Sequence, residues 1–224
     1  MTTVTEAVLA RRSTRAFLDT PVSLDTVQAI LETARRSPSG SNVQPWYVDV
    51  MTGEPLAALL TDVKASLAAN PKGEGSEYEL YFEGLPEPYR SRRFQCGEDM
   101  YATIGVTREN KLGRLIQFAQ NFEGFGAPVM LFFSIDRRFG PAQWAHLGMY
   151  MQTIMLLAEE RGLATCPQEA WMVMYKTVSR HLALPEERML YCGMALGYAD
   201  TSAPINTLVT ARAELDEYVT MRGF

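Results

Sequence analysis

The chain has 224 residues and a net charge of −5, from 21 basic and 26 acidic side chains. Apolar residues make up 47% of it and charged residues 21%, which is typical of a globular protein with a sizeable core. The acidic balance disfavours nucleic-acid binding, because a polyanion is repelled at long range. A small anion can still be held by a local cluster of arginines.

Cysteine and histidine usage excludes further classes of site. Cys96, Cys166 and Cys192 lie far apart, which disfavours both a disulfide framework and a structural zinc site. His146 and His181 show no metal-ligand spacing, so we expect no metal. The sequence shows no signal-peptide pattern and no apolar run near the roughly 20 residues that a membrane span needs. We therefore expect a cytoplasmic protein without a membrane segment.

Hydrophobic periodicity and capping residues predict the elements in chain order. Thr3 and Glu6 have capping-box spacing before the first helix, and Ser23 can cap the second. The pattern predicts helices at 3–10, 23–34, 54–69, 108–122, 142–161 and 173–182, with a short helical segment near 213–219. It predicts strands at 46–51, 127–134 and 189–196. Helices that come first and strands scattered between them favour a single α+β domain over residues 1–224.

Residues 71–97 are rich in proline and glycine and end in a basic stretch, which predicts a long surface excursion. Loops of this length are usually functional lids or disordered linkers. The aromatic residues Tyr78, Tyr81, Phe82 and Tyr89 favour an ordered lid. These rings can stack on a flat substrate, or they can simply pin the loop to the surface.

Arg11, Arg12, Ser13 and Arg15 place three guanidiniums and a hydroxyl at the end of the first helix. Guanidinium groups match phosphate oxygens two by two, and hydroxyls add short hydrogen bonds, so this segment can clamp a phosphate. The alternative is that these cations only complement the helix dipole and stay solvated.

Two further segments carry polar groups that can bind a ligand. The loop from Pro38 to Gln44 combines a glycine, which permits close approach of the backbone, with several donors and acceptors suited to the polar edge of a flat heterocycle. Its alternative is an ordinary helix-to-strand turn. The segment from Thr165 to Glu169 follows the long helix and can line a cofactor pocket, or it can be a simple turn. Cys166 lacks a nearby histidine to activate it as a nucleophile.

Together these pieces resemble the nitroreductase family, and within it the nitrobenzoate-reductase-like subgroup. The resemblance begins with RRSTRAF and PSGSNVQPW. It continues through GAPVMLFFSIDRRFGPAQWAHLGMYMQTIMLLAEERGLATCPQEAW, CGMALGYADTSAPIN and TARAELDEYVTMRGF, so it covers nearly the whole chain. Ala211 departs from the subgroup, which often has an acidic residue before the C-terminal arginine.

The resemblance implies a nitroreductase-like α+β fold with a central, mostly antiparallel sheet, built as an intertwined homodimer that binds FMN in the subunit interface. Arg11, Arg12, Ser13, Arg15 and Arg212 would hold the phosphate and ribityl end. The isoalloxazine would be reached by residues that come in part from the partner chain: Pro38, Ser39, Ser41, Asn42 and Gln44. The flavin's other edge would meet a third set: Pro167, Gln168, Glu169 and, with a weaker claim, Gln117.

The activity that the resemblance implies is the reduction of nitroaromatic compounds to hydroxylamines or amines, with NADPH or NADH as the electron donor. The hydride would pass through flavin N5 in a ping-pong mechanism, so no catalytic protein residue is expected. One alternative is a flavin enzyme of the same fold that acts on quinones, flavins, halogenated or unsaturated compounds. Another is a flavin carrier without catalytic activity.

Overall fold

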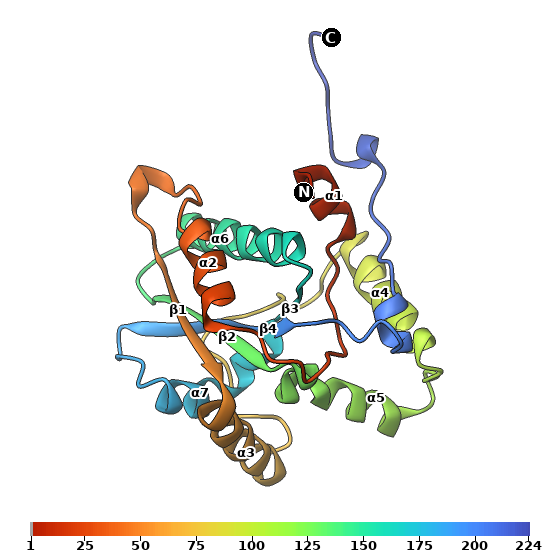
Figure 1. Cartoon of the computed structure of the whole chain (residues 1–224). Coiled ribbons are helices and arrows are strands. Elements are labelled where there is room, and N and C mark those ends of the chain that lie inside the picture. Colours follow the sequence, from red (N-terminus) through yellow and green to blue (C-terminus); the bar gives the residue numbers. More distant parts are fainter. Residues whose placement is uncertain (1) are drawn as a thin grey trace.

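A computed structural model describes residues 2–224. Four strands form one sheet in the order β1-β2-β4-β3, and every strand pairing in it is antiparallel. The strands are β1 (Trp46–Thr52), β2 (Val129–Asp136), β3 (Ala164–Gln168) and β4 (Arg188–Gly197). Helices surround this sheet (Figure 1), which confirms the predicted α+β fold with a central antiparallel sheet.

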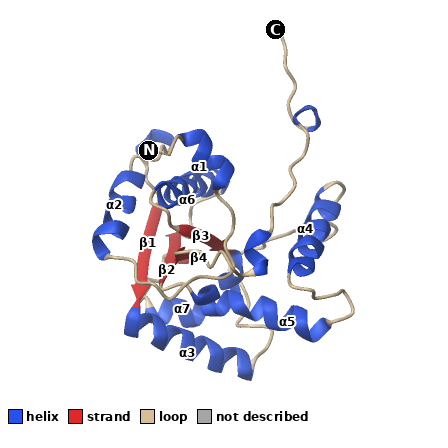
Figure 2. Cartoon of the chain, turned by 45° about the vertical axis from the view of Figure 1, so that its right-hand side comes forward, coloured by secondary structure: helices blue, strands red, loops and turns tan. Residues whose placement is uncertain are grey.

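The sheet separates two apolar cores. Helices α2 (Leu24–Ala34) and α6 (Pro141–Glu160) cover one face, and α3 (Gly53–Ala69) and α7 (Tyr175–His181) cover the other (Figures 1 and 2). Strand β2 alternates between the two, so that Leu131 and Phe133 enter the first core while Met130 and Phe132 enter the second. A strand buried on both faces has a continuous apolar sequence, which is why it was predicted as buried.

The predicted helix starts are confirmed at the first two helices. Before α1 (Val4–Ala10), the Thr3 hydroxyl accepts a hydrogen bond from the Glu6 amide at 3.2 Å, and the Glu6 carboxylate accepts one from the Thr3 amide at 2.7 Å. Before α2, the Ser23 hydroxyl accepts from the Thr26 amide at 3.2 Å. Each bond satisfies an amide that the helix leaves unpaired.

The segment between α3 and β2 differs from the prediction. The chain is irregular after α3, but α4 (Tyr89–Thr103) takes up the end of the expected excursion, and α5 (Lys111–Ala119) is shorter than predicted. No side chain of α4 is fully buried, so this helix lacks the apolar stripe that would reveal it. Helix α4 is instead held by α5, because the Arg114 guanidinium donates two hydrogen bonds to the Glu98 carboxylate of α4, at 2.6 and 2.8 Å.

The segment expected as a polar strip or turn after α6 is strand β3. It lies at the edge of the sheet, where Pro167 can sit because an edge strand does not need every amide for pairing. Short 3-10 helices complete the fold at Gly40–Asn42, Gln120–Gly126, Glu169–Met174, Pro204–Thr207 and Leu215–Glu217. The C-terminal segment then extends away from the body of the chain (Figures 1 and 2).

Gly193 in β4 is required by packing. A Cβ there would lie 2.5 Å from Cδ1 of the fully buried Trp171. We expect Gly193→Ala to lower the free energy of unfolding by about 1–3 kcal/mol, because an overpacked core must shift. Urea unfolding measures this. Gly97→Ala in α4 is the control, since its Cβ meets nothing within 4 Å and alanine favours a helix. Equal unfolding midpoints for Gly193→Ala and the wild type would contradict the expectation.

Candidate cofactor-binding site

The arginines that follow α1 lie at the outer edge of β3. Ser13 pairs with Thr165 in a parallel bridge, and the Thr14 amide donates to the Thr165 carbonyl at 3.0 Å. This pairing fixes the backbone of residues 11–15 against the strand. Arg11, Arg12 and Arg15, called the arginine cluster below, therefore lie next to β3.

Asn206 anchors this segment, and the sequence analysis gave it no role. Its Oδ1 accepts a hydrogen bond from the Arg15 amide at 2.7 Å, and its Nδ2 donates to the carbonyls of Ala16 and Asp200 at 2.8 and 2.9 Å. Its own carbonyl accepts from the Arg12 guanidinium at 3.3 Å. Asn206 is only 9% exposed, so these groups depend on one another rather than on water.

The arginine cluster is not neutralised within the chain. None of its three guanidiniums forms an ion pair with a carboxylate of residues 2–224. Arg12 lines a hollow of about 530 Å³ together with Glu159 and Asn206. Burial raises the pKa of the Glu159 carboxyl, and the nearby Arg12 and Arg11 partly offset this effect. Of the three arginines, Arg12 borders this hollow, and a guanidinium without a carboxylate partner beside an open hollow can bind phosphate oxygens.

Cys166 is excluded as a nucleophile by its surroundings. The thiol is buried in β3, and this burial raises its pKa to about 11, even though Arg15 and Arg11 act in the opposite direction. The group is therefore a neutral thiol near pH 7 and a poor nucleophile.

Gln168 joins the end of β3 to the α5 region. Its Nε2 donates to the Asn121 carbonyl at 2.7 Å, and the side chain is only 2% exposed. Gln117 lies in α5, four residues before Asn121. The Gln168 side chain thus faces inward, and it is Pro167 and Glu169 that border the outside. Burial raises the pKa of the Glu169 carboxyl.

The loop from Pro38 to Gln44, called the 38–44 loop below, is bent by residues in the left-handed region. Ser41, Asn42 and Gln44 have φ of 51°, 55° and 50°. The Ser39 hydroxyl accepts from the Gln44 amide at 3.0 Å, and the Gln44 side-chain amide donates to the Asn42 carbonyl at 3.0 Å. These internal bonds give the loop a defined shape, and its polar side chains remain largely exposed.

The 38–44 loop and the arginine cluster occupy opposite ends of α6. The loop contacts His146 near the start of the helix, whereas Arg12 shares its hollow with Glu159 near the end. At about 1.5 Å per residue, these two positions are about 20 Å apart along the helix. Figure 1 shows the same separation, with α1 at one end of α6 and the loop before β1 at the other. One chain therefore presents the loop and the arginine cluster as two separate candidate half-sites.

Arg212 lies in the extended C-terminal segment, and its described contacts do not reach the arginine cluster. Its guanidinium donates to the Thr210 carbonyl and hydroxyl at 3.0 and 2.6 Å, and to the Ala211 carbonyl at 2.9 Å. The same segment is tied to α4 by the ion pair between Arg92 and Glu217 at 2.8 Å.

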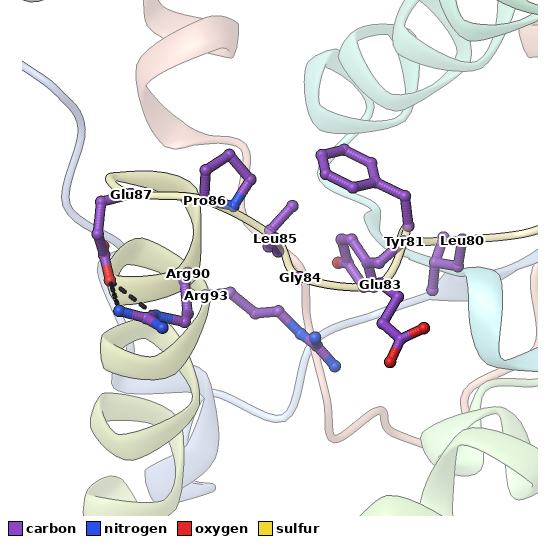
Figure 3. Close-up of a pocket in the computed structure, with 10 residues that line it drawn as sticks. Leu80, Tyr81, Glu83, Gly84, Leu85, Pro86, Glu87, Arg90 and Arg93 are labelled. Carbon is purple, nitrogen blue, oxygen red and sulfur yellow. Dashed lines mark hydrogen bonds and ion pairs between the residues drawn. The ribbon is translucent and has the colours of Figure 1, made fainter.

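A second hollow, of about 760 Å³, lies between residues 80 and 93 (Figure 3). The Arg93 guanidinium stands 4.3 Å from the centre of the Tyr81 ring, while Arg90 is paired with Glu87 at 2.6 Å. The guanidinium of Arg93 thus lies over one face of the Tyr81 ring, as in a cation–π contact.

Neither a metal site nor a membrane-spanning helix is found among residues 2–224. No group of three or more histidine, cysteine, aspartate and glutamate side chains is arranged to hold a metal ion. No helix there combines the length and the apolar character needed to cross a membrane.

Comparison with known proteins agrees with this architecture. The model of the nitroreductase family matches residues 8–198. The chain is 37% identical to a chloronitrobenzene nitroreductase of Comamonas testosteroni, over 97% of this chain and 96% of that protein. It is also 37% identical to a 4-nitrobenzoate reductase of Pseudomonas putida, over 97% of this chain and 94% of that protein.

A solved structure is similar over the whole chain. The crystal structure of the FMN and NADPH-dependent nitroreductase NfnB from Sphigopyxis sp. strain HMH matches with a TM-score of 0.96 and 46% identity, covering 99% of this chain and 100% of that one. A family model that matches most of the chain, together with near full-length relatives, identifies the family. The chain belongs to the nitroreductase family.

Proposed function

We propose that this protein is an FMN-dependent NAD(P)H oxidoreductase that reduces nitroaromatic compounds. The observation that carries the proposal is the arginine cluster, whose charge is left unpaired at the edge of β3, as a phosphate-binding site requires. The named relatives support the substrate class, since they are reductases of chloronitrobenzene and 4-nitrobenzoate. The NfnB structure supports FMN and NADPH as cofactor and electron donor.

The residues present fit FMN. Arg11, Arg12, Ser13 and Arg15 would hold the phosphate end, and Pro167 and Glu169 would border the ring on the β3 side, with Gln117 nearby. The 38–44 loop of a partner chain would supply Pro38, Ser39, Ser41, Asn42 and Gln44, and Arg212 would approach from the extended C-terminal segment. When bound, FMN supplies the redox chemistry, taking a hydride from NAD(P)H and giving it to the substrate in alternate half-reactions.

The protein's own part is binding and orientation. The guanidiniums and the backbone fixed by Asn206 hold one end of the cofactor in place. Cys166 is not a poised acid or base, because it is a buried neutral thiol. On the substrate side, the Tyr81 ring can stack on a nitroarene, and Arg93 can pair with its electron-rich oxygens. Residues 71–97 would then act as the lid.

A homodimer completes the site. A two-fold axis across α6 would place the 38–44 loop of one chain beside the arginine cluster of its partner, and would do so twice. The outer face of α6 suits such contact, since Ala142, Ala145, Gly148 and Met149 are exposed and allow close approach. Further exposed apolar side chains support a large interface: Val4, Val8 and Leu9 on α1, and Leu112, Leu115 and Ile116 on α5.

We expect the purified protein to be a dimer that separates only on unfolding, because a folded monomer would expose these apolar faces to water. Light scattering over a dilution series, with circular dichroism in parallel, measures this. A folded monomer that retains flavin at low concentration would be incompatible with a site shared between chains.

The activity is tested by an absorbance scan of the purified protein, followed by anaerobic titration with NADPH and NADH and then by addition of nitrobenzene. We expect one FMN per chain, bleaching of the flavin by the preferred donor, and recovery of its colour as phenylhydroxylamine forms. Protein without flavin would refute the proposal. Flavin that is reduced but not reoxidised by the nitroarene would indicate another oxidant, such as a quinone or a halogenated compound. Flavin that no donor reduces would indicate a carrier.

The proposed setting is the cytoplasm. All three cysteines are free thiols, which supports a reducing compartment.

A further inference from the structure

His146 makes a contact with the 38–44 loop that neither the sequence pattern nor the proposed function uses. Its Nε2 accepts a hydrogen bond from the Gly40 amide at 3.2 Å. A Cβ on Gly40 would lie 3.2 Å from the His146 Cε1, so the ring and the loop backbone are in close contact. The other described hydrogen bonds of the loop run between its own residues, for example from the Asn42 amide to the Ser39 carbonyl at 2.9 Å.

The conformation that this contact supports is costly. Ser41, Asn42 and Gln44 all have φ near +50°, and none of them is glycine. Left-handed backbone costs an ordinary residue about 1–2 kcal/mol, so it persists only where the surroundings enforce it. The hydrogen bond from Gly40 to α6 ties the loop to the rigid body of the molecule and so helps to enforce it.

The backbone amide of Gly40 can only donate, so Nε2 of His146 is the acceptor of this bond. The other ring nitrogen, Nδ1, is buried and has no hydrogen-bond partner in residues 2–224. Leaving a buried polar atom unpaired is unfavourable, so the ring is not placed there for stability alone.

We propose that His146 is a positioning residue for flavin binding. By holding the Gly40 amide, it keeps Ser41, Asn42 and Gln44 in the shape that meets the isoalloxazine bound with the partner chain. It acts through the loop and does not itself touch the cofactor. This inference rests on the proposed function, because it assumes that the 38–44 loop faces the flavin.

Two amide variants separate this role from general packing. The side-chain amide of His146→Gln reaches as far as Nε2 does and can accept from Gly40, whereas that of His146→Asn reaches only as far as Nδ1. FMN affinity is measured by quenching of flavin fluorescence on titration of the apo-dimer. We expect His146→Asn to weaken FMN binding about 3- to 10-fold, as the loss of one hydrogen bond implies, and His146→Gln to stay within about twofold of the wild type.

Gly40→Ala changes the same contact from the side of the loop. It keeps the proposal testable even if a His146 variant in α6 fails to fold. We expect it to weaken FMN binding as well, because its Cβ would press against the His146 ring and shift the loop. The effect of the double variant with His146→Asn should fall short of the two single effects combined, because both changes act on one contact. Wild-type affinity in His146→Asn and Gly40→Ala would overturn the positioning role. So would binding by His146→Gln that is as weak as by His146→Asn. A wild-type protein that binds no FMN would instead refute the proposed function.

Discussion

Arg15→Ala is expected to weaken FMN binding about 10- to 150-fold, since a charge-assisted contact to phosphate contributes roughly 1.5–3 kcal/mol. Arg15 is half-buried at the edge of β3, and no carboxylate of residues 2–224 pairs with it, so a bound phosphate would be its counter-charge. Titration of the apo-protein with FMN, followed by fluorescence quenching, measures the change. The variant should also melt at a lower temperature, and excess FMN should restore much of the difference.

Two further variants separate the loss of the phosphate contact from a general loss of positive charge. Arg15→Lys should restore binding only in part, because an ammonium cannot reproduce the two parallel bonds of a guanidinium. Arg35→Ala is the matched control, since Arg35 follows α2 directly, is exposed and pairs with Glu32 at 2.7 Å. It should leave FMN affinity unchanged. If Arg15→Ala and Arg12→Ala both bound FMN like the wild type, the phosphate site would lie elsewhere.

Asn206→Ala is expected to lower the free energy of unfolding by about 2–4 kcal/mol. The change removes three side-chain hydrogen bonds and leaves the Arg15 amide without its partner, while the carbonyls of Ala16 and Asp200 each keep one backbone donor. A buried amide left unsatisfied costs about 1–3 kcal/mol, and each of the other two bonds contributes about 0.5–1.5 kcal/mol. Urea unfolding of the apo-protein measures the loss directly.

The neighbouring Thr207 provides the control for Asn206. It is exposed and makes one hydrogen bond, to the Pro204 carbonyl at 2.7 Å, so Thr207→Ala should change stability by no more than about 1 kcal/mol. Asn206→Ala should in addition weaken FMN binding, because Arg12 and Arg15 lose their anchor. An Asn206→Ala protein as stable as Thr207→Ala would show that the side-chain hydrogen bonds of Asn206 are not needed for the fold.

Local sequence signals were enough to predict an element wherever the segment carries its own capping residues and its own hydrophobic period. The capping pairs before α1 and α2 are present as predicted, and the buried strands β2 and β4 follow their apolar runs. Such elements can be predicted because the determining contacts lie within a few residues. Helix α4 and strand β3 were missed for the opposite reason. Helix α4 is held by ion pairs to α5 and the C-terminal segment, and β3 is a short edge strand defined by its partners.

The candidate site also divides into residues that lie close together in sequence and residues that meet only in the fold. The arginine cluster and the 38–44 loop are each contiguous in sequence, so they could be identified as candidate binding segments. Asn206 and His146 could not, since they meet their partners across 191 and 106 residues. Nor does the sequence reveal that the Gln168 side chain faces inward, because an alternating strand must be placed in its sheet before the two faces can be told apart.

In the proposed dimer, the length of helix α6 sets the distance between the 38–44 loop and the arginine cluster of each chain. Removal or insertion of one turn would displace the arginine cluster relative to the 38–44 loop by about 5.4 Å. Neither flavin could then meet both of its half-sites, although every residue that contacts it would be intact. The length of α6 should therefore be preserved among related proteins even where its exposed side chains outside the interface differ.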